Sequence, residues 1–393
     1  MKSPWRILAL LSVAELLGMS VWFSASALAP QLGEMWSLSP AQAGWLTSAV
    51  QLGFVAGTAA AAVLNLADIV PARAYFALAA LAAATANAAL LAAGGFGQAV
   101  AARFATGLFL AGVYPPAMKM ISTWYRDGRG LAIGTVVGAL TVGKAVPFLV
   151  HGLERSGLAP LVLASSGACA LAGLMVLVAY RDGPFAFERR PFAWNLVGTV
   201  ARHREVRLAI GGYLGHMWEL YAMWVWIAAF LAAGAGLAAR AADVAAFAAI
   251  AAGGVGCVVG GWAADRFGRE RLTVWAMAVS GSCAALVGLA IGSPALAVAV
   301  ALVWGFAIVA DSAQFSALVT ELAPSHAVGT ALTLQTSLGF LLTMASIQLV
   351  PHLVGAVGWR WAFVALAAGP ALGIGAMRRL LSLRRGAPRV LGG

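Results

Sequence analysis

Ionisable side chains interrupt several long apolar stretches of this sequence. Glu15, Glu219 and Asp311 are acids in such stretches, and Arg103 and Lys144 are bases in others. An isolated charge in an apolar medium is costly, so each of these groups needs an opposite charge, a water-filled cavity or a bound solute. Carboxyl groups in a low-dielectric cavity can also exchange protons near neutral pH. The pattern therefore indicates ion or proton binding in apolar surroundings.

Glu15 and Glu219 are the leading candidates for contact with protons or a solute. Trp22 follows Glu15 by seven residues, and Trp226 follows Glu219 by the same interval. Seven residues are two helical turns, which would place each tryptophan on the face of its glutamate. This predicts two carboxylates beneath aromatic walls. The alternative for each glutamate is a structural hydrogen bond to a neighbouring helix.

Further candidates come from the other polar residues of the apolar stretches. Lys144 follows a run of glycines and either attracts an anion or neutralises one of the acids. Asp311 is another candidate for proton or solute contact. Additional polar or aromatic side chains that we expect to line the same region are Tyr114, His216, Tyr221 and Trp224.

Metal binding is an alternative use of one of these helical faces. His216, Glu219 and Met223 share a face at spacings of three and four, which would suit a soft metal ion. Methionines on apolar helices more often serve in packing, so no metal site and no cofactor are predicted. The cysteines lie in apolar runs without a CxxC pair and indicate neither a disulfide framework nor a metal centre: Cys169, Cys257 and Cys283.

Composition places all of these residues in a membrane protein. Of 393 residues, 62% are hydrophobic and 10% are charged, whereas soluble domains carry roughly 25% charged residues. A helix needs about 20 apolar residues to cross a bilayer. We predict an all-α integral membrane protein with about twelve spans, at 6–30, 41–66, 74–94, 97–121, 130–152, 158–180, 208–232, 241–264, 272–291, 294–320, 327–350 and 359–377.

The basic residues sort to one side of these spans. The net charge is +11, and most of the 25 Lys and Arg residues fall in the termini, the central polar segment and every second loop, while Arg155, Arg240 and Arg360 fall on the other side. Positive charge stays in the cytoplasm, so both termini are predicted to be cytoplasmic. The first apolar run contains Glu15 and is expected to be a span, not a cleaved signal peptide.

The chain divides into two halves that follow one plan. The segment from Glu15 to Trp22 matches that from Glu219 to Trp226 in identical register, with Glu, Leu, Met, Val and Trp repeated. We therefore predict an N-terminal six-helix bundle (1–180), a cytoplasmic linker (181–207), and a C-terminal six-helix bundle with a short basic tail (208–393).

One loop carries a sharper signature. The stretch Gly261-Trp-Ala-Ala-Asp265-Arg266-Phe-Gly268-Arg269 resembles the GxxxDRxGR loop of major facilitator superfamily transporters. Its glycines allow close helix approach and a tight turn, Asp265 can cap a helix N-terminus or pair with an arginine, and the two arginines hold the cytoplasmic helix ends together. As a gate, this loop would stabilise the outward-facing state. The alternative is an ordinary basic loop.

Two further motifs resemble the family pattern in part. In the first half, Asp68 and Arg73 survive from the same loop signature, which predicts a weaker gate there. Arg103 and Gly107 resemble an RxxxG motif of the fourth span. The resemblance implies a role for this arginine in substrate or proton coupling, and the alternative is an arginine that reaches the lipid headgroups.

The resemblance implies two pseudo-symmetric bundles around a cavity lined by spans 1, 4, 7 and 10. No basic residue lies in span 2, or in span 8 before Arg266, which disfavours nitrate transport, and span 5 lacks the Gly-Pro dipeptide of drug–proton antiporters. No phosphate-binding loop and no catalytic constellation occurs, so we do not expect an enzyme.

The sequence predicts a proton-linked secondary transporter, a symporter in a bacterial-type cytoplasmic (inner) membrane, working by alternating access. Arg103 and Lys144 favour a small organic anion as solute. A transporter or exporter of cations, metals or drug-like solutes is one alternative, and a non-transporting receptor or sensor is another. Expected partners are the solute, protons and the lipid bilayer, without nucleic acid, and the family resemblance implies a monomer.

Overall fold

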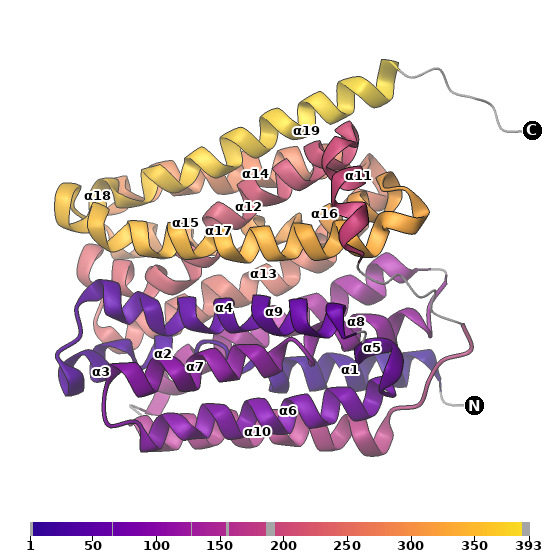
Figure 1. Ribbon diagram of the computed structural model, residues 1–393. Coiled ribbons are helices and arrows are strands. Elements are labelled where there is room, and N and C mark those ends of the chain that lie inside the picture. Colours follow the sequence, from indigo (N-terminus) through magenta and orange to yellow (C-terminus); the bar gives the residue numbers. More distant parts are fainter. Residues whose placement is uncertain (1–2, 65, 127, 155–156, 186–192, 387–393) are drawn as a thin grey trace, which may run out of the picture.

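The computed structural model describes residues 3–64, 66–126, 128–154, 157–185 and 193–386, which are almost entirely helical and contain no strand. The helices lie along one long axis (Figure 1). Within these described ranges, eleven helices are long and apolar enough to cross a membrane. The fold is therefore all-α, as predicted.

The helices of the first half are α1 (Pro4–Met19), α2 (Ser24–Ala27), α3 (Ala29–Trp36), α4 (Pro40–Val63), α5 (Leu66–Ile69), α6 (Ala72–Ala88), α7 (Phe96–Leu110), α8 (Tyr114–Ser122), α9 (Arg129–Glu154) and α10 (Leu158–Ala179). Those of the second half are α11 (Val197–Arg202), α12 (Arg204–Ala229), α13 (Ala239–Phe267), α14 (Arg269–Leu286), α15 (Pro294–Ala310), α16 (Ser312–Leu322), α17 (Val328–Val357), α18 (Trp359–Ala362) and α19 (Ala368–Gly386).

Three of the predicted spans are interrupted near their middle. The first ends as a helix at Met19 and continues through the irregular stretch 20–23 into α2. The fourth breaks between α7 and α8, where prolines occupy the first turn of α8 and need no hydrogen-bond partner for an N–H. The tenth breaks at Asp311, between α15 and α16. Because α1 ends at Met19, the helical spacing that was predicted to place Trp22 on the face of Glu15 does not hold.

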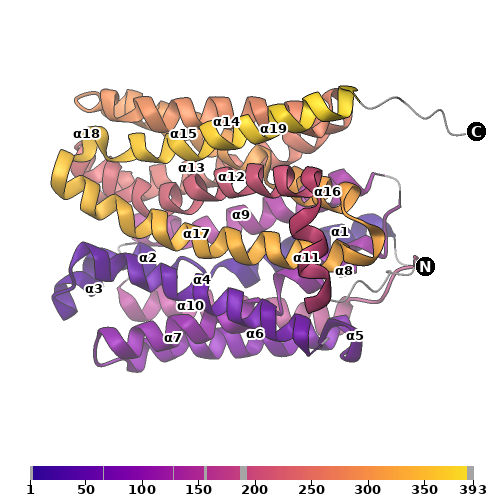
Figure 2. The ribbon, with the colours of Figure 1, turned by 45° about the horizontal axis from the view of Figure 1, so that its top comes forward.

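Helices of each half pack mainly against one another, and two seams join the halves. In the first half α4 packs on α7, and α6 and α1 pack on α10; in the second, α12 and α14 pack on α19, and α13 packs on α15. The seams are the contacts of α9 with α13 and of α4 with α17, and Figure 2 shows α17 lying along α4. The predicted boundaries of the two bundles and the linker stay predictions.

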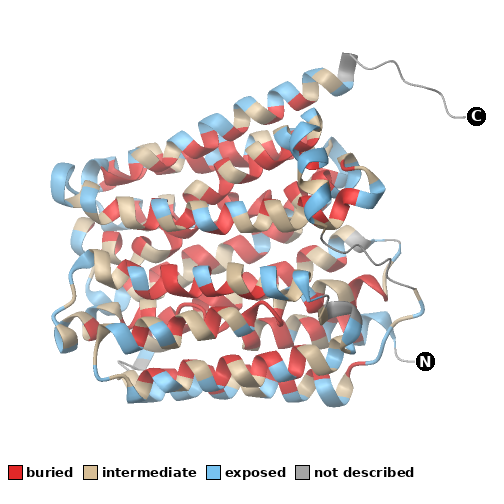
Figure 3. Cartoon of the chain, viewed as in Figure 1, coloured by how far each residue is buried: buried red, intermediate tan, exposed pale blue. Residues whose placement is uncertain are grey.

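The two ends of the molecule can be named from the chain. The helix α1 begins and α19 ends at the same end, which we call the termini end; the other is the opposite end (Figure 1). Buried residues follow the inward faces of the helices, whereas exposed residues follow the outside (Figure 3). Large apolar side chains lie exposed on that outside, as at Leu78, Val178 and Leu372. Such a surface suits lipid, which is as apolar as these side chains.

Candidate functional site

A close helix contact brings Lys144 and Glu15 together. A Cβ atom at Gly143 of α9 would stand 2.2 Å from the backbone oxygen of Leu16 in α1, so only glycine permits this approach. Lys144 and Glu15 are the neighbours of these two residues, and their charges interact. The exposed fraction is 4% for Lys144 and 0% for Glu15. The predicted acid and base are therefore buried within reach of each other's field.

Lys144 lies in an aromatic surrounding. Its Nζ atom donates a hydrogen bond to the hydroxyl of Tyr221 at 2.6 Å. The same atom lies 4.1 Å from the ring centroid of Trp22, 5.0 Å from that of Tyr221 and 5.6 Å from that of Trp224. Ring faces attract a cation and partly replace the water that it has lost. Since Tyr221 and Trp224 belong to α12, these contacts of Lys144 cross between the halves.

The rings around Lys144 form one buried group, which we call the aromatic cluster. Centroid separations are 4.9 Å between Phe54 and Phe340, 5.4 Å between Trp22 and Phe54, and 5.8 Å between Trp22 and Tyr221. These rings come from the irregular stretch after α1 and from α4, α12 and α17, so the cluster joins the halves. Its members are Trp22, Phe23, Phe54, Tyr221, Trp224 and Phe340.

Several polar atoms at this cluster have no hydrogen-bond partner within the described part of the chain. Both carboxylate oxygens of Glu15 are unpartnered, as are Nε1 of Trp22, Nε1 of Trp224 and Nε2 of Gln51. Gln51 belongs to α4, one turn from Phe54, and its Oε1 accepts a hydrogen bond from Thr343 of α17 at 2.6 Å. A buried donor or acceptor without a partner costs about 1–3 kcal/mol. Such atoms need a partner from outside the described chain, which a water, an ion, a proton or a bound ligand can supply.

Glu219 differs from Glu15 in its surroundings. Its two oxygens accept hydrogen bonds from Ser280 at 2.8 Å and from Nε1 of Trp304 at 2.7 Å. Trp226 donates its own Nε1 hydrogen to the carbonyl of Ile347 at 2.9 Å. The structural hydrogen bond that was the alternative for each glutamate is thus present for Glu219, and no such bond engages Glu15 among the described residues.

Asp311 and His216 lie together beside the break in the tenth span. Nδ1 of His216 is 2.9 Å from Oδ1 of Asp311, although this oxygen receives no aligned hydrogen bond. Nε2 of His216 lies 2.8 Å from the hydroxyl of Ser312. Tyr114 begins α8 and is near enough to Glu15 to interact with its charge. Within the described residues no group of three or more His, Cys, Asp or Glu side chains could hold a metal ion.

Arg103 is fully buried and all of its N–H groups point at protein acceptors. Its Nη1 donates to Oδ1 of Asn87 at 2.7 Å and to Ser24 at 3.1 Å, and its Nε donates to the carbonyl of Leu46 at 3.5 Å. Its Nη2 donates to the carbonyl of Val21 at 3.0 Å and to that of Trp22. Those last two carbonyls lie where α1 has ended. The guanidinium therefore donates hydrogen bonds to the carbonyls left free at the break in the first span. It also links this break to α4 and α6.

The motif around Arg103 has a packing reason as well. A Cβ atom at Gly107 would stand 1.9 Å from the backbone oxygen of Val50, so α7 and α4 meet there at backbone distance. Asn87, the partner of Arg103, was not identified from the sequence. The available signal was a lone amide in the alanine-rich third span, and it also donates to Ser166 of α10 at 2.9 Å.

At the termini end, Asp265 crosses the seam between α13 and α9. Its carboxylate oxygens lie 3.5 and 3.7 Å from the place of a Cβ atom on Gly130, in the first turn of α9. A carboxylate at a helix N-terminus interacts favourably with the helix dipole. Gly261 also faces Gly130, but a Cβ there would make an ordinary contact of 3.8 Å. The closest approach of α9 and α13 therefore lies at another point of the seam.

The rest of the loop signature shapes the turn between α13 and α14. Gly268 has a φ of 93°, which favours glycine. Arg269 binds Glu321 at 2.8 Å and Gln314 at 2.5 Å, both in α16, while the guanidinium of Arg266 lies 5.8 Å from the ring of Trp262. In the first-half copy, Arg73 is exposed at the start of α6, and the side chain of Asp68 is outside the described residues.

At the opposite end, α13 holds the C-terminus of α9. Nε of Arg240 donates to the carbonyl of Gly152 at 2.9 Å, and its Nη2 donates to that of Leu153 at 2.5 Å. His151 and Asp243 form a second contact, with 2.8 Å between Nδ1 and Oδ2. We call these two contacts the opposite-end latch. Sequence reasoning missed it, and the only signal was that Arg240 is one of the few bases predicted for that side.

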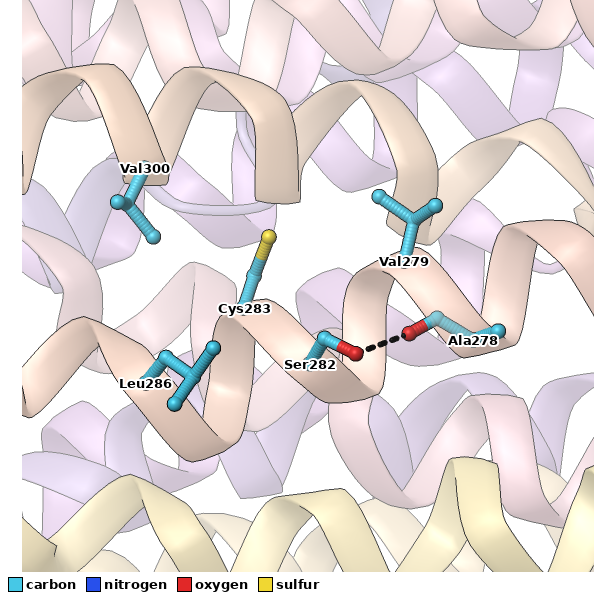
Figure 4. Close-up of a pocket in the computed structure, with 6 residues that line it drawn as sticks. All are labelled: Ala278, Val279, Ser282, Cys283, Leu286 and Val300. Atoms are coloured by element: carbon cyan, nitrogen blue, oxygen red, sulfur yellow. Dashed lines mark hydrogen bonds between the residues drawn. The ribbon is translucent and has the colours of Figure 1, made fainter.

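A groove on the outside of the second half lies apart from these charges. It runs between α14 and α15 and includes Ser282, whose hydroxyl donates to the carbonyl of Ala278 at 2.7 Å (Figure 4). The lining is mostly apolar and partly faces the outside: Ala278, Val279, Ser282, Cys283, Leu286 and Val300. We assign it no part in the candidate site.

Comparison with known proteins identifies the family. The model of the Major Facilitator Superfamily matches residues 10–347. The chain belongs to this superfamily. Family and fold together indicate an integral membrane transporter of small-molecule substrates, not an enzyme. No curated protein matches this superfamily member in sequence.

Solved transporters share the fold at low sequence identity. A bacterial homologue of the human lysosomal transporter Spinster, inward-facing and unoccupied, aligns with a TM-score of 0.76 at 16% identity, covering 96% of this chain and 98% of that one. The same homologue in an occupied state aligns at 0.71 and 15%, covering 98% of each. A variant of the nucleoside transporter NupG aligns at 0.71 and 13%, covering 95% and 99%. At such identities the likeness establishes the fold alone.

Proposed function

We propose that this superfamily member is a proton-linked transporter of a small organic anion that works by alternating access. The observation that carries the proposal is the pair of Glu15 and Lys144. Both are buried, the carboxylate in α1 of the first half has no hydrogen-bond partner in the described chain, and the ammonium in α9 contacts rings from both halves.

The chemistry of coupling follows from this pair. With no solute bound, the negative charge of Glu15 offsets the positive charge of Lys144. An anion that binds Lys144 takes over this role, and Glu15 is left as an unpaired charge in a dry surrounding, which favours its protonation. One anion and one proton then cross together. For a monoanion the transported pair is neutral, so the site can change sides without moving net charge.

The remaining candidate residues take supporting roles in this proposal. Arg103 acts as a clamp of the first span, because its donors are already engaged. His216 and Asp311 form a second group through which protons could pass on the other side of the seam, while Glu219 positions helices through Ser280 and Trp304. The walls of the site are Trp22, Tyr114, Tyr221 and Trp224.

The seam between α9 and α13 supplies the gates. The contact of Asp265 with the start of α9 would open when the site faces the termini end, and the latch of Arg240 would open when it faces the opposite end. The distribution of basic residues supports a cytoplasmic position for the termini end. We further propose a monomer in a bacterial-type inner membrane, in which residues 1–180 and 208–393 move against each other.

The test is anion-dependent proton movement in liposomes that contain the purified protein and an internal pH indicator. A panel of organic monoanions, added outside as potassium salts, should acidify the interior with the wild type. The variant Glu15→Gln should abolish this acidification, because a neutral amide cannot carry the proton. Glu34→Gln is the matched control, since Glu34 is exposed in α3 of the same half. Anion-driven acidification that survives in Glu15→Gln would contradict the proposal.

Transport of an organic cation is the second candidate, and the unpartnered oxygens of Glu15 favour it. The ammonium of Lys144 opposes it, because a like charge beside the solute is unfavourable. In the same liposomes, a cation–proton exchanger would make the interior more alkaline when an organic cation is added outside.

A further inference from the structure

We infer that the solute is a monocarboxylate with a flat, unsaturated or aromatic body. This inference rests on the proposed function and adds the class of anion. Three independent features at the cluster support it: one available cation, a set of N–H donors without acceptors, and walls made of rings.

The charge available at the seam matches a single negative charge. Within the described part of the chain, Lys144 donates one of its three hydrogens to a protein acceptor, the hydroxyl of Tyr221. Arg103, the other buried base near α1, has its five N–H groups directed at five protein acceptors. A dicarboxylate or a phosphate dianion would therefore bring one charge more than the site balances. A monoanion is the better match.

The unpartnered donors select a carboxylate. Nε1 of Trp22, Nε1 of Trp224 and Nε2 of Gln51 are buried N–H groups without acceptors in the described chain. A carboxylate has two oxygens with about four acceptor positions and no donor. Each hydroxyl of a sugar or polyol would bring a donor as well, and among these unpartnered atoms only the oxygens of Glu15 could accept it. These three donors therefore fit a solute group that only accepts hydrogen bonds, as a carboxylate does.

The rings of the aromatic cluster favour a flat body for the solute. Trp22, Phe54 and Phe340 pack with centroids 4.9–5.8 Å apart, in tilted or edge contacts. Phe54 belongs to the first half and Phe340 to the second, so movement of the halves separates these rings. A flat ring or conjugated chain can replace the lost ring contacts by stacking, which a compact polar solute cannot do.

A zwitterionic amino acid is the closest competitor. Its ammonium group would bind the free oxygens of Glu15, and its carboxylate would bind Lys144. In that case Glu15 would be a substrate ligand and not the carrier of the proton. The experiment therefore includes an aromatic amino acid beside an aromatic acid of similar size.

The experiment is thermal unfolding of the detergent-purified full chain with benzoate, phthalate, benzylamine, phenylalanine and sulfate at matched ionic strength. A ligand of the folded state raises its unfolding temperature. Benzoate should give the largest increase, and Lys144→Met should remove it, while Arg202→Gln at the exposed end of α11 should not. Trp224→Phe keeps a ring and removes one donor, so it should weaken benzoate binding about tenfold.

The outcomes separate this inference from the proposed function. If sulfate or phthalate stabilises more than benzoate and requires Lys144, the anion transporter stands and the aromatic monocarboxylate is wrong. If phenylalanine stabilises more than benzoate and requires Glu15, the proton role of Glu15 fails as well. The absence of any benzoate effect on the wild type overturns the inference. Should Lys144→Met not fold, an unchanged benzoate affinity in Trp224→Phe overturns it instead.

Discussion

Gly138 of α9 and Gly254 of α13 lie against each other where the two halves cross. A Cβ atom on Gly138 would stand 2.8 Å from the carbonyl oxygen of Gly254, and one on Gly254 would stand 2.9 Å from the carbonyl oxygen of Gly138. Backbone meets backbone here, midway between Asp265 at one end of the seam and Arg240 at the other. Under the proposed alternating opening of the two ends, this crossing is the point about which α9 and α13 would pivot.

Adding a methyl group at this crossing should impair movement and stability together. We expect Gly138→Ala and Gly254→Ala each to lower the free energy of unfolding by about 1–3 kcal/mol, because an overfilled contact must shift backbone. Anion-driven acidification should also slow. Thermal unfolding and the liposome assay measure the two effects.

Gly167→Ala is the control for this prediction. Gly167 lies in α10, and a Cβ atom there meets nothing within 4 Å. Alanine should be neutral or slightly stabilising at that position. Transport at the wild-type rate in both seam variants would show that the crossing is not a pivot.

Arg103 should be required for folding more than for coupling. Lysine in its place keeps the charge but has three donors on one atom, so at least two of the five acceptors lose their partner. Each buried group left unsatisfied costs about 1–3 kcal/mol. We expect Arg103→Lys to lower the unfolding temperature strongly, while any protein that folds still couples anion to proton. Arg73→Lys, on an exposed residue, controls for the substitution. Intact stability with lost coupling would restore the coupling role that the family resemblance implies.

The opposite-end latch and the contact of Asp265 should bias the transporter in opposite directions. Arg240→Gln removes a cation from the C-terminus of α9, and Asp265→Asn removes an anion from its N-terminus. Each change is worth about 1 kcal/mol, or about fivefold in the ratio of two conformations. Spin labels on exposed Leu153 of α9 and Leu296 of α15 report the opposite end, after replacement of the native cysteines by alanine.

We expect longer distances between these labels in Arg240→Gln and shorter distances in Asp265→Asn. The control is Arg271→Gln, which removes a base near the same loop but outside the contacts described for the seam. A change of the same sign in both seam variants would refute the assignment of the two ends as alternating gates.

The spans were predictable from the sequence because each is a long apolar run, and such runs have no other stable place than a bilayer. Lys144 and Glu15 were also predicted as site residues, since a charge in such a run requires an explanation. The break after Met19 was not predicted, because no proline marks it. Its carbonyls are satisfied by Arg103 from a helix some 80 residues later, and a contact of that kind depends on packing that no local pattern encodes.

The same limit applies to the latch. Arg240 was assigned to a side by its charge alone, while its partners are backbone carbonyls of Gly152 and Leu153, which carry no side-chain signal. Likewise, the repeat makes Glu15 and Glu219 equal in sequence. Their different surroundings come from neighbours on other helices, Ser280 and Trp304 for Glu219 and Lys144 for Glu15.

The two glutamates should therefore separate in experiment. Glu219→Gln places an NH₂ group where one of the two donors, Ser280 or Trp304, now points, so one hydrogen bond is lost and two donors face each other. We expect a lower unfolding temperature with anion–proton coupling retained. Glu15→Gln should abolish coupling; it breaks no protein hydrogen bond in the described chain, so it should lower the unfolding temperature only through the lost charge that offsets Lys144. Measuring both properties in both variants decides the matter: equal loss of coupling in the two variants would restore Glu219 as a coupling residue beside Glu15, as the sequence analysis expected of both.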